Sequence, residues 1–239
     1  MLSPALFKNA NAINLVTKRN FIMTTNFRAI ATCLLAYICF DLMSVHVRLL
    51  SSNYSPQELS VYRNVIGVLP AIFYMWYSKE LSLKISDYKI EKWKLGILRG
   101  LIIAVAQLCF YTALANLELA TVSALGQVSA LFIVLLAIFL YKEKVGFWRW
   151  TAVIVGFLGA TMIMKPGTDI FSWYSILPIC AAFCYASSIV TLRSFKSSVS
   201  SAILFLYSAT SAAFGAMILA FGSITFTPIK SLMDGLLIT

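Results

Sequence analysis

The sequence has little charge and almost no histidine. Only 12% of its 239 residues are charged, against about 25% in ordinary soluble domains, while 60% are hydrophobic and the mean hydropathy is +0.86. This imbalance excludes a fold that has water as its main solvent. The single histidine, His46, excludes a multi-histidine metal site and most histidine-dependent hydrolytic arrangements. No cluster of nucleophiles, bases or metal ligands predicts an enzyme, and no residue pattern requires a cofactor.

The cysteines and the basic residues exclude two further classes of protein. All five cysteines lie within apolar segments, where they act as small hydrophobes and form no disulfide framework. The formal net charge of +10 would suit nucleic acid, but the Lys and Arg residues stand between apolar runs, where positive charge marks cytoplasmic loops. We therefore expect no nucleic-acid partner.

Long apolar runs make up most of the chain. Runs of about 20 residues, bounded by charges or turn residues, match the thickness of a bilayer. They predict an all-α integral membrane protein in contact with lipid, because helices satisfy their own backbone hydrogen bonds there and no alternating barrel pattern is present. Seven spans are predicted, at residues 28–50, 61–78, 96–117, 120–141, 146–165, 171–193 and 201–222.

The basic residues also predict the orientation of these spans. Of the 19 Lys and Arg residues, 15 fall on one side of the membrane, which the positive-inside rule makes cytoplasmic. The exceptions are Arg48, Arg63, Lys165 and Lys230. Residues 1–27 then form a cytoplasmic N-terminal segment, read either as a weak organelle-targeting presequence or as a start codon assigned too early, with Met23 as the alternative.

The sequence repeats itself at an offset of 145 positions. Between positions 39 and 71 this offset gives eight identities, among them Arg48 with Arg193 and Tyr62 with Tyr207. Five predicted spans separate the two copies, and this odd number gives the second copy the opposite orientation in the membrane. Inverted repeats of this kind are typical of alternating-access carriers, whose substrate site lies between the two halves.

The repeat divides the chain into three parts. After residues 1–27, residues 28–167 form a first copy of five helices, and residues 168–239 form an incomplete second copy with two helices and the start of a third. The expected fold is an inverted five-helix repeat carrier, with about seven transmembrane helices present of ten. We expect the second copy to be truncated at its C-terminal end, which leaves three further helices unaccounted for.

Several segments resemble the EamA family of the drug/metabolite transporter superfamily. They are LRG at 98–100, YTAL at 111–114, ATVSAL at 120–125, LFIVLLAIFLYKEKV at 131–145 and FWRWTAVIVGFLGATMIMKPG at 147–167. An Asp and an Arg in the first hairpin, together with LRG and the RW step, are similar to S-adenosylmethionine uptake carriers. The resemblance implies two inverted five-helix repeats and a bacterial inner membrane. The family's frequent proline early in the fourth helix is absent around 129–132, which leaves the kink of that helix open.

Six residues are candidates for substrate binding. Asp41 lies inside the first predicted span, where a charge must face a cavity or a partner, so it is either a substrate or proton site or part of a network with Arg48. Arg63 and Arg99 would hold a substrate carboxylate or phosphate, or else anchor lipid headgroups. Polar side chains at membrane depth complete the set, either as cavity residues or as links between helices: Gln107, Tyr111 and Gln127.

The leading hypothesis is a secondary transporter that moves a small polar metabolite, such as an amino acid, a nucleotide-like compound or an S-adenosylmethionine-like compound, by alternating access. A truncated, non-functional carrier remnant is the main alternative. A seven-helix receptor fits poorly, because the charge bias places the N-terminus inside, and a membrane enzyme lacks a catalytic cluster. Besides the small-molecule substrate and the bilayer, the partner is either a second copy of the chain or none.

Overall fold

The described part of the chain is helical. The computed structural model describes residues 27, 30–78, 90–142, 146–165, 172–195 and 199–221, and all regular structure within them is α-helix or 3-10 helix, as the sequence predicts. The predicted cytoplasmic segment, apart from residue 27, lies outside the described residues. The predicted start of the second copy's third helix, beyond residue 222, also lies outside them.

Two compact units divide the chain, Met1–Ser44 and Val45–Thr239. Apart from residue 27, the described part of the first unit belongs to the helix Ile30–Leu50, which is long and apolar enough to cross a membrane and which continues into the second unit. Asp41 lies on the part of this helix that belongs to the first unit. The helices described below all belong to the second unit.

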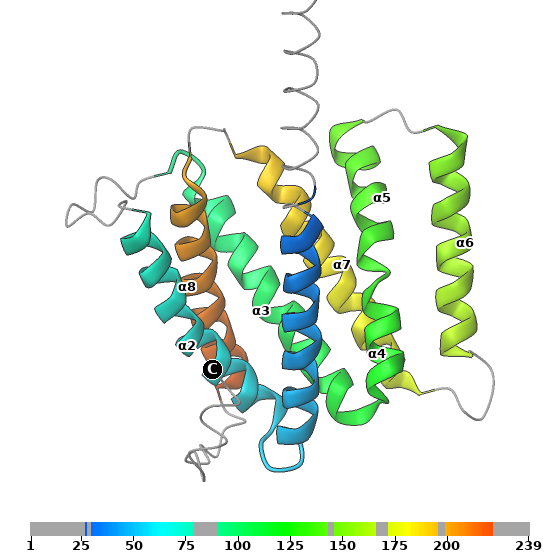
Figure 1. Ribbon diagram of the computed structural model, residues 1–239, viewed down its shortest axis with the longest axis horizontal. Helices are drawn as coiled ribbons and strands as arrows, with labels where there is room; N and C mark the ends of the chain where they lie inside the picture. Colours follow the sequence, from blue (N-terminus) through cyan, green and yellow to red (C-terminus); the bar gives the residue numbers. More distant parts are fainter. Residues whose placement is uncertain are drawn as a thin grey trace, which may run out of the picture. The chain divides into compact units, whose positions relative to one another are not determined.

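Seven further α-helices lie in the described part of the second unit (Figure 1). They are α2 (Pro56–Tyr77), α3 (Trp93–Asn116), α4 (Leu119–Gly126), α5 (Ser129–Tyr141), α6 (Phe147–Met164), α7 (Ile176–Thr191) and α8 (Ser201–Ala220). Short 3-10 turns flank α7 at Trp173–Ser175 and Leu192–Ser194. Each predicted span therefore corresponds to a helix, and α4 and α5 together occupy the fourth.

Six helical segments of the described residues are long and apolar enough to cross a membrane. They are Ile30–Leu50, Trp93–Asn116, Leu119–Tyr141, Phe147–Met164, Trp173–Ser194 and Ser201–Ala220. The sequence predicts a span at 61–78 as well, and the 22-residue α2 covers it but is not among these six. Polar residues lower its hydropathy, and three of them are buried: Glu58, Ser60 and Asn64.

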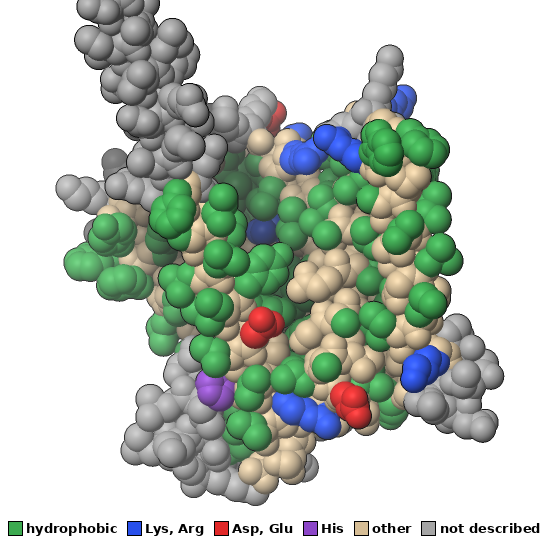
Figure 2. Space-filling model, turned by 45° about the vertical axis from the view of Figure 1, so that its right-hand side comes forward, with side chains coloured by type: hydrophobic (Ala, Val, Ile, Leu, Met, Phe, Trp, Pro, Cys, Tyr) green, Lys and Arg blue, Asp and Glu red, His purple; other side chains and the backbone are tan. Residues whose placement is uncertain are grey.

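The outer helices carry the hydrophobic surface that lipid requires. On α6, the side chains of Trp148, Val155 and Met162 are 84%, 67% and 77% exposed. Figure 2 shows hydrophobic side chains over the surface of α5 and α6. Such a surface is unfavourable in water but is well suited to acyl chains, which need no hydrogen bonds from the protein.

The central helix of the second unit is α3, which packs against α2, α7 and α8. It approaches α8 tightly at Gly100, where an added Cβ would lie 1.8 Å from Oγ of Ser211 and 2.6 Å from the main-chain oxygen of Ser208. Small residues allow helices to approach closely when no side chain separates them. Gly100 therefore serves the packing of α3 against α8.

The helices α2 and α8 begin at positions that match the repeat in the sequence. Their N-cap residues, Ser55 and Ser200, are equivalent at the 145-residue offset. Oγ of Ser55 accepts a hydrogen bond from the Glu58 amide at 3.3 Å, and Oγ of Ser200 accepts one from the Ala202 amide at 3.1 Å. The two helices pack against each other and run in opposite directions (Figure 1).

A break separates α4 from α5 although no proline is present there. The amide of Val128 bonds the carbonyl of Leu125, and the amide of Ala130 bonds the carbonyl of Gln127, each three residues back rather than four. This is the tighter hydrogen-bond pattern of a 3-10 turn, which within a helical segment often marks a hinge. The missing family proline therefore does not make this segment a continuous helix.

Candidate functional site

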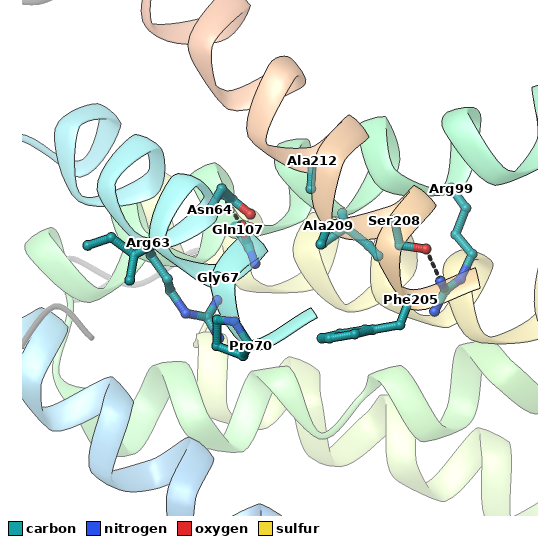
Figure 3. A pocket seen from close by; sticks show the side chains of 12 residues that line it. Arg63, Asn64, Gly67, Pro70, Arg99, Gln107, Phe205, Ser208, Ala209 and Ala212 are labelled. Atoms are coloured by element: carbon teal, nitrogen blue, oxygen red, sulfur yellow. Dashed lines mark hydrogen bonds between the residues drawn. The ribbon is translucent and has the colours of Figure 1, made fainter. Parts of the chain in front are cut away.

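A cavity of about 330 Å³ lies between α2, α3 and α8 (Figure 3). Its size is at the lower end of the range for small-molecule sites, about 300 to 1,000 Å³. Each of the three helices contributes both polar and apolar residues to its wall. The lining residues are Arg63, Asn64, Ile66, Gly67, Pro70, Arg99, Ile103, Gln107, Phe205, Ser208, Ala209 and Ala212.

The residues that α3 contributes to the cavity wall all lie on one face of this helix. Arg99, Ile103 and Gln107 are spaced four residues apart, so they lie one above another on the same face of the helix. Tyr111 lies one more turn along this face and is only 1% exposed. The cavity therefore has a guanidinium at one level of α3 and an amide two turns further along.

Asn64 and Gln107 form a buried amide pair in the wall of the cavity. Nδ2 of Asn64 donates to the Ser60 carbonyl at 2.7 Å and to Oε1 of Gln107 at 2.5 Å. A carbonyl can only accept, so the atom of Asn64 that contacts the Ser60 carbonyl must be the amide nitrogen Nδ2. Because Nδ2 also contacts Gln107, the side-chain atom of Gln107 that faces it must be the acceptor, Oε1. Nε2 of Gln107 makes no hydrogen bond to the described residues, so it offers N–H donors to a solute.

Arg99 joins three helices at the edge of the cavity. Its Nε donates to the Ser188 carbonyl on α7 at 3.1 Å, and its Nη1 donates to Oγ of Ser208 on α8. Ser208 itself donates to the Leu204 carbonyl at 2.8 Å, so its single O–H is engaged and its oxygen is turned to accept from Arg99. These contacts favour an internal role for Arg99 over the alternative of headgroup anchoring.

Arg63 reaches the cavity from α2, on the side opposite Arg99 in Figure 3. Its guanidinium hydrogen-bonds the Tyr111 hydroxyl and lies near Tyr185 of α7. Both groups are neutral phenols, so neither neutralises the charge of the guanidinium, and the bond to Tyr111 holds it in place. Arg63 is therefore held in position while its positive charge remains uncompensated by these contacts.

The cavity brings together three of the six predicted site residues, namely Arg63, Arg99 and Gln107. Tyr111 does not line the cavity, but its hydroxyl hydrogen-bonds the guanidinium of Arg63. Gln127 lies elsewhere, at the α4–α5 break, where its side chain is exposed. Asp41 lies in the other compact unit, and its role stays a prediction.

Other residues of the cavity were not among the predicted site residues. Asn64 could have been found as an amide within an apolar run, whereas Ser208 resembles the many serines that simply bond their own helix. Pro70 also lines the cavity and has no N–H, so the carbonyl of Ile66, four residues earlier, loses its usual helical donor. A backbone acceptor at the wall is a feature that residue types alone do not reveal.

Six helical segments long and apolar enough to cross a membrane, within the described residues, define a multi-pass membrane protein. The chain belongs to the EamA-like transporter family, whose model matches residues 27–165. This confirms the resemblance seen in its sequence.

Curated relatives carry the names of transporters. An uncharacterized transporter of Helicobacter pylori is 29% identical over 140 residues, which is 59% of this chain and 46% of that protein. An S-adenosylmethionine uptake transporter of Rickettsia prowazekii is 25% identical over 193 residues, covering 80% of this chain and 63% of that protein. A riboflavin transporter of Vibrio cholerae is 39% identical over 66 residues, covering 28% of this chain and 22% of that protein.

These relatives agree with the expectation that the chain is not an enzyme. The chain spans about half the length of the first of them, and at most 63% of the three. Their named substrates differ from one another, which is expected for a family that uses one fold for many solutes.

Proposed function

We propose that this protein is a secondary transporter that carries a small polar metabolite across a bacterial inner membrane by alternating access, with its N-terminus in the cytoplasm. The cavity between α2, α3 and α8 is its substrate site. Amino acids, nucleotide-like compounds and S-adenosylmethionine-like compounds are the candidate solutes, the last because of the Rickettsia relative.

The observation that carries this proposal is the position of the cavity between α2 and α8. These helices begin at equivalent positions of the two sequence copies, run antiparallel and pack against each other. In carriers built from inverted repeats, the solute binds where the two copies meet, and one copy rocks against the other. The chamber's mainly apolar wall with a few polar side chains, as small-molecule sites have, supports the same role.

A flux assay in liposomes tests the proposal. The reconstituted chain is offered labelled S-adenosylmethionine, a mixture of amino acids, adenosine monophosphate and riboflavin, and uptake is compared with that of empty liposomes. We expect saturable uptake of at least one of these compounds. Absence of uptake for all of them, by protein that is monodisperse and inserted, would overturn the proposal.

A matched pair of variants tests whether the cavity is the site. At Gly67, which lines the cavity, and at Gly159 on the outer helix α6, an added Cβ has no atom within 4 Å. Gly67→Trp should fill the chamber and abolish uptake, whereas Gly159→Trp should leave uptake intact. Equal uptake by the two variants would place the solute site elsewhere.

A further inference from the structure

The charges that line the cavity are all positive. Arg63 and Arg99 contribute two guanidinium groups, and no Asp or Glu is among the lining residues of the described chain. A charged side chain at membrane depth is costly unless a partner or water compensates it, so such residues usually mark a functional site. The excess of positive charge in the lining therefore indicates what kind of solute the cavity binds.

The contacts of Arg99 hold its charge in place without neutralising it. Both of its hydrogen-bond acceptors, the Ser188 carbonyl and the Ser208 hydroxyl, are neutral groups. Because these acceptors come from α7 and α8, Arg99 is held between helices and is poorly placed to swing out to an anion. It therefore supplies a fixed positive potential at one side of the chamber.

Arg63 has fewer of its N–H donors engaged by described residues than Arg99 has, so more of them can bind a solute. Its guanidinium hydrogen-bonds the Tyr111 hydroxyl, and this bond uses only part of a group that carries five N–H donors. A planar guanidinium binds carboxylate and phosphate groups through two parallel hydrogen bonds. Nε2 of Gln107, on the same chamber wall, supplies further neutral donors.

We propose that the cavity recognises its solute by an anionic group, a carboxylate or a phosphate, with Arg63 as the anchor and Arg99 as a fixed second positive charge. This inference rests on the proposed function and narrows it. It favours solutes such as amino acids, S-adenosylmethionine and nucleotides, all of which carry such a group, over a neutral solute such as riboflavin. Tyr111 acts as a positioning residue for Arg63.

The sign of the potential can be measured without knowing the solute. In a Gly67→Cys variant of the full chain, the thiol is labelled either with anionic 2-sulfonatoethyl methanethiosulfonate or with the cationic trimethylammonioethyl reagent. Peptide mass spectrometry reads the rate at position 67, so the five native cysteines can stay. Gly146→Cys is the matched control, because Gly146 is exposed, has open space at its Cβ and lies outside the cavity.

We expect the ratio of anionic to cationic labelling at Gly67→Cys to exceed that at Gly146→Cys by about ten-fold, as potentials of a few kT produce in a charged cleft. Adding Arg63→Gln should lower the ratio strongly, while Arg63→Lys should largely keep it. Equal ratios at the two cysteines would overturn the inference. An unchanged ratio in a folded Arg63→Gln variant would also overturn the role of Arg63.

Competition in the flux assay separates this inference from the proposed function. If a carboxylate-bearing solute is transported, its amide or methyl ester should compete poorly, and a phosphate-bearing solute should lose competition when the phosphate is removed. Transport of riboflavin that no anionic compound inhibits would leave the carrier function standing and overturn the anion site. No flux together with a high labelling ratio would instead overturn the carrier function and support the anion site.

Discussion

Arg99 on α3 donates a hydrogen bond from Nε to the main-chain carbonyl oxygen of Ser188 on α7, at 3.1 Å. In a regular helix this carbonyl would accept from residue 192, but the Leu192 amide bonds the carbonyls of Ile189 and Val190. Helix ends leave carbonyls unpaired and carry a partial negative charge. A guanidinium at this position therefore satisfies an unpaired acceptor and interacts favourably with the helix dipole.

Replacing Arg99 should loosen the contact between α3 and α7. We expect Arg99→Met to lower the free energy of unfolding by about 1 to 2 kcal/mol, because it removes the bonds to both Ser188 and Ser208. Arg99→Lys should lose less, since it keeps the charge and one donor. Thermal unfolding in detergent measures both. Lys94→Met is the control on the same helix, where the side chain is exposed, and an equal loss there would contradict the prediction.

Gly100 should tolerate no side chain. The Cβ of Gly100→Ala would lie 2.6 Å from the Ser208 main-chain oxygen, which cannot move without shifting α8, so we expect a loss of about 1 to 3 kcal/mol. Gly159→Ala is the matched control, because its Cβ meets nothing within 4 Å and alanine favours the helix. The measurement compares the midpoints of thermal unfolding of Gly100→Ala and Gly159→Ala. Gly100→Ala with wild-type stability would mean that the α3–α8 contact is looser than described.

The amide pair of Asn64 and Gln107 should behave as a coupled unit. Asn64→Leu leaves the buried Oε1 of Gln107 without its donor, and we expect a cost of about 1 to 3 kcal/mol. Adding Gln107→Leu removes the unpaired group, so the double variant should lose less than the sum of the two single variants. A double-mutant cycle on unfolding measures this coupling, and strictly additive losses would rule it out.

The break between α4 and α5 should exchange its amide hydrogens faster than the helices beside it. Hydrogen exchange read by mass spectrometry should show lower protection across residues 127–130 than within α5, because the amides there form the poorer 3-10 pattern. Gly126→Ala should raise protection, since alanine is about 1 kcal/mol better than glycine in a helix and its Cβ would meet Phe110 only at 3.6 Å. Unchanged protection would show that the break does not depend on this glycine.

Hydropathy alone could predict most of the helices but not all of their ends. The apolar run begins near residue 61, yet α2 begins at Pro56, because Ser55 and Glu58 form a reciprocal capping box and proline suits the first turn. The capping residues are polar, so a search for apolar stretches passes over them. The α4–α5 break is the converse case, a turn within an apolar run, and its weak local signal is Gly126 followed by Gln127.

The candidate site could be predicted only in part, for a related reason. Arg63, Arg99 and Gln107 stand out because charged and amide groups are rare at membrane depth, and the structure brings them to one cavity. Which groups face one another depends on how α8 packs between distant segments, and no local spacing encodes that. This is why Ser208 was missed and why Gln127, an equally polar residue, lies away from the chamber.

The paired caps at Ser55 and Ser200 have a consequence for how such a chain can be built. Each serine closes its own first turn with an amide two or three residues further on, so neither cap depends on a neighbouring helix or on the compartment it faces. A cap that forms within a single helical turn works equally well whichever way the helix crosses the membrane. The same stretch of sequence can thus form a helix in either membrane orientation, and the Lys and Arg residues of the flanking loops determine which orientation it takes.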